Sequence, residues 1–302
     1  RLVLLAVGAF RGFTNTHWAS GRRHVEYVMD SPTHMPFPRN KNGFTVLHHA
    51  AAKNNEQIML SILESVGERD RVQLISMLDP LGNSILRLAA LESEANLLRC
   101  ILRSMSEADR LHLLVNQDLL GYTVLHWAVL KSNMLSVGSI LELLGEKSRM
   151  ALLCIQDKLD RTALHLSAEM GDTQMMKCLL ALLQNSHRCQ LLAMRTAAGF
   201  SVLQLAVEEG KVQFVGDVLH SLGDSWRKTL LKSQDLDGDT LLHFIVEKGN
   251  RESMKCVLES INEAARMVIL GMPNCNGLMA LHLAAEKNHD SIVGCILESL
   301  NM

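Results

Sequence analysis

An eight-residue phrase that returns at a constant interval constrains the fold more than any other feature of the sequence. It reads Gly-Tyr-Thr-Val-Leu-His-Trp-Ala from Gly121 to Ala128, and close variants open at six other positions. The opening residues are 39 positions apart: Gly43, Gly82, Gly121, Asp160, Gly199, Gly238 and Gly277. A fixed period of this kind is typical of repeat architectures, in which each unit buries its apolar face on its neighbours. The sequence therefore predicts one array of stacked units.

One complete unit, residues 121–159, predicts three helices. Thr123 is a candidate N-cap, because its hydroxyl can accept hydrogen bonds from the amides of a first helical turn. A first helix should place Leu125 and Ala128 on one face and end near residues 131–133. A second helix follows, with four apolar residues on its inner face: Val137, Ile140, Leu141 and Leu144. A third short helix is expected over 149–155, before an extended linker at 156–159.

Two slots are filled identically in the units. Leu fills the fifth slot of all seven phrases: Leu47, Leu86, Leu125, Leu164, Leu203, Leu242 and Leu281. Arg is predicted to begin the third helix of every complete unit: Arg71, Arg110, Arg149, Arg188, Arg227 and Arg266. A residue repeated in every unit serves the stack and not a single site. Because a guanidinium can donate to several acceptors at once, we expect these arginines to bond carbonyls and the linker acids, namely Asp79, Asp118, Asp157 and Asp235.

The phrase, followed by a helix, a Gly or Asn break, a second helix and an Asp-x-x-Gly turn, resembles the ankyrin repeat. Two departures are visible. The proline that usually follows Thr is absent, and the unit is about six residues longer than the usual 33, with the excess in the third-helix segment. The resemblance implies an all-α, ankyrin-like repeat solenoid of about eight stacked units, each with an extra short third helix.

The expected boundaries follow the period. Residues 1–11 read as the end of a preceding unit, 12–42 as a degenerate unit, and 277–302 as a truncated last unit. The full units are 43–81, 82–120, 121–159, 160–198, 199–237 and 238–276. Three of the five prolines lie in residues 31–39, where a helix cannot continue, so a loop is expected there. The loop is interpreted either as an irregular join or as a hinge or docking segment for a partner. The ends suggest a monomeric array within a longer chain.

Composition excludes several classes of partner. The net charge is −2 and the basic residues are scattered, so nucleic-acid binding is not expected. No apolar stretch approaches the length of a membrane span, so membrane insertion is not expected either. Four of the seven cysteines share one slot of the repeat: Cys100, Cys178, Cys256 and Cys295. Equivalent atoms of stacked helices lie too far apart for a disulfide, so buried free thiols and an intracellular, cytoplasmic location are predicted.

Candidate catalytic groups are explained by the repeat. Six histidines occupy one slot of the phrase, with Arg87 and Gln204 in the same slot of two other units: His17, His48, His126, His165, His243 and His282. Repetition favours a hydrogen-bonding role in the turns over a general base. We find no metal-ligand spacing, no phosphate loop and no nucleophile motif, and therefore expect no metal, no cofactor and no enzyme activity.

Function is sought in the slots that vary between units. The resemblance implies that turns and late first-helix positions line a concave face that contacts partners. The turns of the middle units are apolar, and the candidate partner-binding residues are Phe44, Leu81, Leu119, Leu120, Tyr122, Leu159, Arg161 and Phe200. Alternatively, the longer unit folds these turns inward as core. The sequence predicts a non-catalytic module or scaffold for a protein partner; the alternative is a targeting or regulatory arm of a larger enzyme, channel or secreted effector.

Overall fold

The computed structural model describes residues 39–91 and 95–300, which fold as helices only apart from two isolated β-bridges. The chain divides into two compact units, residues 1–148 (unit 1) and 149–302 (unit 2), and each is described by itself. The division falls within α10 (Glu146–Leu153). The degenerate unit expected before residue 39, the proline-rich loop up to residue 38, and His17 lie outside the described residues.

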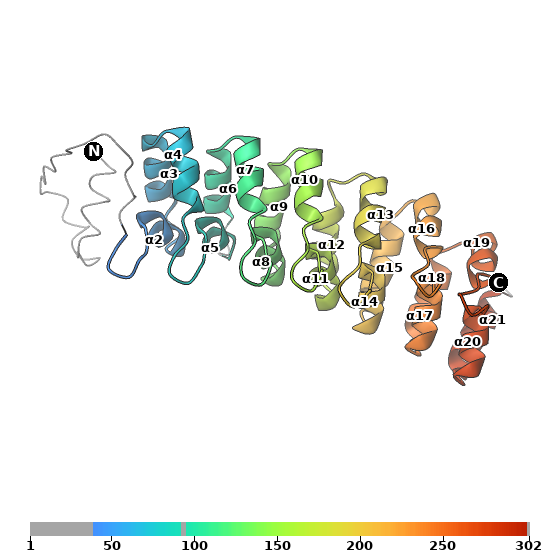
Figure 1. The fold of residues 1–302 in the computed structure, drawn as a ribbon. Coiled ribbons are helices and arrows are strands. Elements are labelled where there is room, and N and C mark those ends of the chain that lie inside the picture. The colour runs from blue at the N-terminus through green and yellow to red at the C-terminus, as the bar shows by residue number, and fades with distance from the viewer. Residues whose placement is uncertain (1–38, 92–94, 301–302) are drawn as a thin grey trace, which may run out of the picture. The chain divides into compact units, whose positions relative to one another are not determined.

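Helices recur in threes along the chain, and each triplet forms one layer (Figure 1). In unit 1 the helices before α10 are α2 (Val46–Ala52), α3 (Glu56–Ser65), α4 (Glu68–Ser76), α5 (Ile85–Leu91), α6 (Asn96–Arg103), α7 (Glu107–Leu114), α8 (Val124–Leu130) and α9 (Met134–Glu142). In unit 2 those after it are α11 (Ala163–Met170), α12 (Thr173–Leu180), α13 (Asn185–Ala193), α14 (Val202–Glu208), α15 (Val212–Ser221), α16 (Asp224–Leu231), α17 (Leu241–Glu247), α18 (Arg251–Glu259), α19 (Glu263–Leu270), α20 (Ala280–Glu286) and α21 (Asp290–Leu300).

The repeated phrase shapes the start of each first helix. Its opening residue lies in the left-handed region in all seven copies, with φ of 74–83° for the six glycines and 56° for Asp160. Glycine adopts this conformation without steric cost, which accounts for its use at the slot. Thr123 then caps α8, accepting a hydrogen bond from the amide of His126 as the sequence predicts. The turn and the cap together fix where each first helix begins.

Packing joins equivalent helices of successive layers. In unit 1, α2 packs on α5 and α5 on α8, while α3 packs on α6 and α6 on α9. In unit 2, α11, α14, α17 and α20 follow one another in the same way. The repeated leucine of the phrase is fully buried in the six layers that precede the last, from Leu47 to Leu242. The core is therefore a continuous apolar seam within each unit.

The third helices begin earlier than the sequence suggested. Arg71, Arg149 and Arg227 each lie three residues after the first residue of their helix, so the prediction that Arg begins the helix is wrong. The preceding turn is polar, as in Glu68-Arg69-Asp70, and gives no apolar pattern from which its start could be read. Two of these helices start directly after Gly67 and Gly223, which adopt an extended backbone conformation as N-caps.

The six repeated arginines, here called the arginine ladder, donate hydrogen bonds to main-chain carbonyls, as expected. Arg227 donates from Nε to the carbonyl of Leu219 at 2.7 Å, from Nη2 to that of Leu222 at 2.9 Å, and from Nη1 to that of Ser260 in the next layer. The other five arginines bond the carbonyl 33 residues ahead in the same way: Arg71, Arg110, Arg149, Arg188 and Arg266. The expected linker acids are not their partners, because those carboxylates bond the amides of the turns. The ladder ties the carboxyl ends of successive second helices.

All seven cysteines are free thiols, as predicted, but fewer of them are buried than the sequence suggested. Of the four in the shared slot, only Cys295 is buried, and Cys100, Cys178 and Cys256 are partly exposed. Cys100 donates from Sγ to Glu56 Oε1 at 3.0 Å, and burial together with this bond raises the pKa of its thiol to about 11. Burial also raises the pKa of the Cys256 and Cys295 thiols in the same slot, which disfavours their reactive thiolate form.

Candidate functional site

The turns between layers are rigid, because a polar side chain closes each of six of them. Asp118 Oδ1 accepts hydrogen bonds from the amides of Leu120 and Tyr122 at 2.9 and 3.0 Å. The same pair of bonds is made by the residue at this slot in five other turns: Asn40, Asp79, Asp157, Asp235 and Asn274. Local bonds of this kind fix a turn without secondary structure. The residues between the clamped amides are therefore held in place.

Consecutive turns are also tied to each other, a feature that the sequence reading missed. In unit 2, Gln156 Nε2 donates to the carbonyl of Asp160 in its own turn and, at 2.9 Å, to that of Arg195, 39 residues ahead. Gln234 makes the equivalent bonds to Gly238 and Pro273. The signal was available as a glutamine recurring at one slot of the period. These bonds join the turn of residues 157–160 to the turn that follows it, and the turn of residues 235–238 to the turn that follows it.

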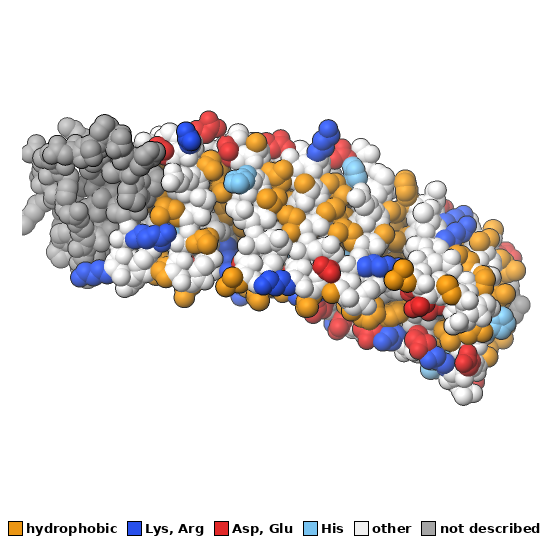
Figure 2. Space-filling view, in the orientation of Figure 1, with side chains coloured by type: hydrophobic (Ala, Val, Ile, Leu, Met, Phe, Trp, Pro, Cys, Tyr) orange, Lys and Arg blue, Asp and Glu red, His pale blue; other side chains and the backbone are white. Residues whose placement is uncertain are grey.

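The predicted leucines of unit 1 project from turns that are closed by an aspartate side chain. The side chains of Leu81, Leu119 and Leu120 are 79, 88 and 55 % exposed. Phe44 and Tyr122 are half-buried, each packed edge-on against a ring of its own first helix. The leucines are therefore surface, whereas the aromatic residues are partly core. On the face shown in Figure 2, hydrophobic side chains lie scattered among polar ones.

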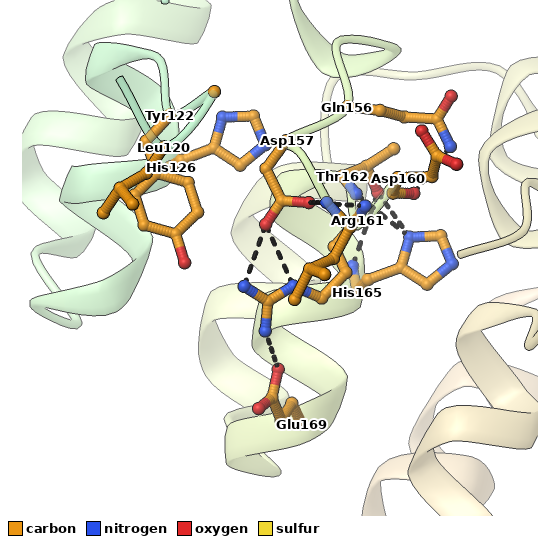
Figure 3. Close-up of polar contacts among 12 residues, drawn as sticks. Leu120, Tyr122, His126, Gln156, Asp157, Asp160, Arg161, Thr162, His165 and Glu169 are labelled. Carbon is orange, nitrogen blue, oxygen red and sulfur yellow. Dashed lines mark hydrogen bonds and ion pairs between the residues drawn. The ribbon is translucent and has the colours of Figure 1, made fainter. Parts of the chain in front are cut away.

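The predicted residues of unit 2 differ from one another in exposure and in bonding. Leu159 is 56 % exposed, and Phe200 is half-buried against Phe244, with ring centroids 5.5 Å apart. Arg161 bonds Asp157 Oδ2 and Glu169 Oε2, each at 2.9 Å, so its charge is neutralised within its own layer (Figure 3). The prediction favoured the apolar middle turns and so missed Leu236, which is fully exposed in the equivalent turn of a later layer.

A cation–aromatic cluster in unit 1 has no counterpart in the repeated pattern. The guanidinium carbon of Arg87 lies 3.8 Å from the ring centroid of Trp127, and Nη1 of Arg87 lies 3.4 Å from Asp118 Oδ2. Trp127 donates from Nε1 to the same carboxylate oxygen at 2.8 Å, and Tyr122 packs edge-on against the indole. Arg87 stands where other units have histidine. The cluster joins the first helices α5 and α8 to the turn at Asp118.

The buried histidines have the hydrogen-bonding role that repetition predicted. Thr162 donates its amide to His165 Nδ1 at 3.2 Å, and Nε2 of His165 donates to the carbonyl of Met194 in the linker of the same layer. Burial lowers the pKa of His165 to about 4, so the ring is neutral at physiological pH. His48, His126 and His243 are equally buried, while His282 is exposed. With both nitrogens of His165 engaged, the ring is a structural bridge.

Two cavities coincide with the two slots that lack this histidine. A cavity of about 200 Å³ in unit 2 is lined by Gln204, and one of about 90 Å³ in unit 1 is lined by Arg87. Residues 39–91 and 95–300 hold no group of three or more His, Cys, Asp or Glu side chains suited to a metal ion. Within the same residues, each helix is too short or too polar to cross a membrane.

Comparison with known proteins identifies structures but no sequences. No family model and no curated protein matches the sequence. Among solved structures, the ankyrin repeat domain of Bcl-3, a member of the IkappaB protein family, aligns with a TM-score of 0.56 and 19 % identity over 72 % of this chain and 86 % of that one. An ankyrin repeat domain from Acinetobacter baumannii AYE aligns with a TM-score of 0.52 and 16 % identity, over 71 % of this chain and 96 % of that one. At these identities the likeness concerns the fold alone.

Proposed function

We propose that this chain, which has the ankyrin-repeat fold, is a non-catalytic module that binds a protein partner through its turns and the adjoining exposed positions of its first helices. One observation supports this most directly. Leucines project into solvent from turns whose backbones are clamped by side-chain hydrogen bonds, as at Leu119 and Leu120. Exposed leucines in a rigid, repeated position contribute nothing to the core of their own layer.

Energetics favour a partner that covers these side chains. Full burial of a leucine side chain stabilises a complex by about 1.5–3 kcal/mol. Side chains on a preorganised backbone also lose little conformational freedom on binding, which reduces the cost of association. The exposed turn leucines Leu81, Leu119 and Leu120, together with the half-buried Tyr122 and Trp127, form the candidate anchor surface of unit 1. Unit 2 would add Leu159 and Leu236.

Site-specific photocrosslinking tests the proposal. A benzophenone amino acid is placed at position 119 in the turn, or at position 135 in α9, where Leu135 is also exposed. We expect a discrete adduct in cell extract from position 119 and none from position 135. Excess unlabelled wild-type chain should compete for the adduct, and excess chain carrying Leu119→Asp and Leu120→Asp should not. An adduct formed equally from position 135, or competed equally by the double variant, would contradict the assignment of the surface.

A further inference from the structure

The larger cavity lies between two consecutive layers of unit 2, at the level of the turns. Its apolar walls come from leucines at the end of α13, the start of α14, the end of α16 and the start of α17: Leu192, Leu203, Leu230 and Leu241. Its polar lining includes Arg195, Gln204, Gln234 and Asp239. Gln204 fills the slot that holds histidine in most other layers, so the cavity occurs where the ring is missing.

A histidine ring bridges the equivalent position in the layer before this one and in the layer after it. In two other layers of unit 2, His165 Nε2 bonds the carbonyl 29 residues ahead, at Met194, and His243 Nε2 bonds the carbonyl 35 residues ahead, at Leu278. The residues at the same offsets from Gln204 are Ser233 and Asp239, and both line the cavity. Gln204 makes neither bond. The acceptors that a histidine would reach are therefore left without that donor.

Gln204 offers a hydrogen-bond donor to whatever occupies the cavity. Its Oε1 accepts from the amide of Ser201 at 3.0 Å and from Arg195 Nη1 at 3.0 Å. Those two bonds fix the orientation of the carboxamide, and its Nε2 has no acceptor among the described residues. Gln204 is 5 % exposed and lines the cavity, so this donor is open to a group that enters it. A ligand with a carbonyl oxygen would satisfy it.

Charge and acceptors restrict the ligand further. Arg195 and Asp239 contribute opposite charges to the lining, so neither a carboxylate nor an ammonium group gains a net attraction. Gln234 donates both of its bonds from Nε2, which leaves its Oε1 as an acceptor. One Asp239 oxygen is bonded by Asn274, and the other remains an acceptor. The lining thus presents a donor and acceptors to one small neutral group.

We propose that this cavity binds a primary carboxamide, the side chain of a glutamine or asparagine on the protein partner. The carboxamide oxygen accepts from Gln204 Nε2, its NH₂ donates to the acceptors of the following layer, and its methylenes contact the leucine walls. A volume of about 200 Å³ is below the about 300–1,000 Å³ typical of small-molecule sites, and suits one side chain. That the carboxamide belongs to a protein partner rests on the proposed function. That the cavity binds a carboxamide does not depend on it.

Three small probes of matched size test the chemistry without any partner. Butyramide, butyrate and butylamine are titrated separately into the ¹⁵N-labelled chain, and the side-chain amide resonances of Gln204 and Gln234 are followed. We expect saturable shifts with butyramide and at least about tenfold weaker binding of both charged analogues, a difference of about 1.4 kcal/mol. Equal or tighter binding of butyrate or butylamine overturns the proposal. So does the absence of saturable shifts, which would mean that the cavity holds water only.

Gln204→His supplies the matched variant, because histidine already fills this slot in layers that fold. The variant lacks the carboxamide donor, and its ring should itself bond an acceptor of the cavity, so butyramide binding should fall at least about tenfold. Gln190→His, at an exposed position of α13, should leave binding unchanged. Butyramide binding that survives Gln204→His places the site elsewhere and overturns the proposal. Failure in this experiment leaves the crosslinking result at position 119 unaffected, so the two proposals are separable.

Discussion

The two ends of each layer differ in what the sequence must specify. At the third-helix end, six arginines make the same bonds to main-chain carbonyls of the second helices. Every residue supplies a carbonyl, so one side chain can be reused without change. At the turn end, the bonds depend on side chains such as Gln156, His165 and Gln204. Variation is possible there, and with it come exposed leucines and a cavity. The comparison assigns the repeated side chains to stability and, under the proposed function, leaves the variable ones for binding a partner.

The largest effect on stability is expected from removing an arginine at the third-helix end of a layer. Arg227→Met removes three hydrogen bonds to carbonyls, each worth about 1.5–3 kcal/mol when the donor is charged. Because water can reach some of these carbonyls in the variant, we expect a net loss of about 3–5 kcal/mol in the free energy of unfolding of unit 2. Urea titration followed by the fluorescence of the neighbouring Trp226 measures it.

Two further variants sharpen this test. Arg227→Lys should recover little of the loss, since a single ammonium group cannot reach three carbonyls in the fork geometry of a guanidinium. Lys232→Met removes an exposed charge from the same unit and should change stability by less than about 0.5 kcal/mol. A loss with Arg227→Met no larger than with Lys232→Met would show that the ladder does not hold the layers together.

Acid should weaken the turn end through its histidines. The pKa of His165 is lowered to about 4 in the folded chain, against 6.5 for the free side chain, with burial as the main cause. The unfolded chain therefore takes up a proton below pH 6.5 that the folded chain takes up only near pH 4. The stability that depends on the neutral ring is complete above pH 6.5 and is lost as the pH falls toward 4, by at most about 1.4 kcal/mol per pH unit.

His165→Gln separates this contribution from the rest. Glutamine fills the slot in the layer of Gln204, so the variant is expected to fold. Urea titrations at several pH values between 4 and 7 should show a shallower decline in its stability than in that of the wild-type chain. Parallel declines would mean that His165 titrates normally and that its ring is not the buried bridge described above.

The same contrast between the two ends explains what could be predicted from sequence. The period, the three helices, the threonine cap and the carbonyl role of arginine were predictable, because each follows from a residue type repeated in one slot. The start of the third helix was not, since Glu68-Arg69-Asp70 carries no apolar pattern. The linker acids were wrongly paired with the six repeated arginines, because the sequence does not show that their oxygens are already bonded by turn amides, as at Asp118.

Exposure and cavities were beyond the sequence for a different reason. Whether Leu119 points outward depends on the geometry of a turn, and the sequence left an exposed and a buried position equally open. The cavity beside Gln204 depends on a space between two layers that one side chain does or does not fill. The substitution itself was visible in the pattern as the exception at a histidine slot. Exceptions at structural slots were the available signal for the candidate site.

Replacing Gln204 with the histidine that most other layers have at this slot is expected to increase the stability of unit 2. Gln204→His replaces the carboxamide with a ring of similar size beside the cavity and should restore a bond from the ring to a carbonyl at position 233 or 239. A net hydrogen bond is worth about 0.5–1.5 kcal/mol, so we expect the free energy of unfolding of unit 2 to rise by about 1 kcal/mol at pH 7. Thermal and urea unfolding measure this. A loss of stability would show that the histidine does not fit between these two layers.

The smallest effect should come from the turn leucines themselves. Leu236→Ser changes a fully exposed side chain, so stability should change by no more than about 0.5 kcal/mol. Leu242→Ser, six residues later in α17, changes a fully buried leucine of the repeated slot and should cost at least about 2–5 kcal/mol, the range for truncating a buried leucine to alanine. The pair is compared by urea unfolding under identical conditions. A cost at Leu236 approaching that at Leu242 would place the turn leucines in the core, and the proposed binding surface would lose its basis.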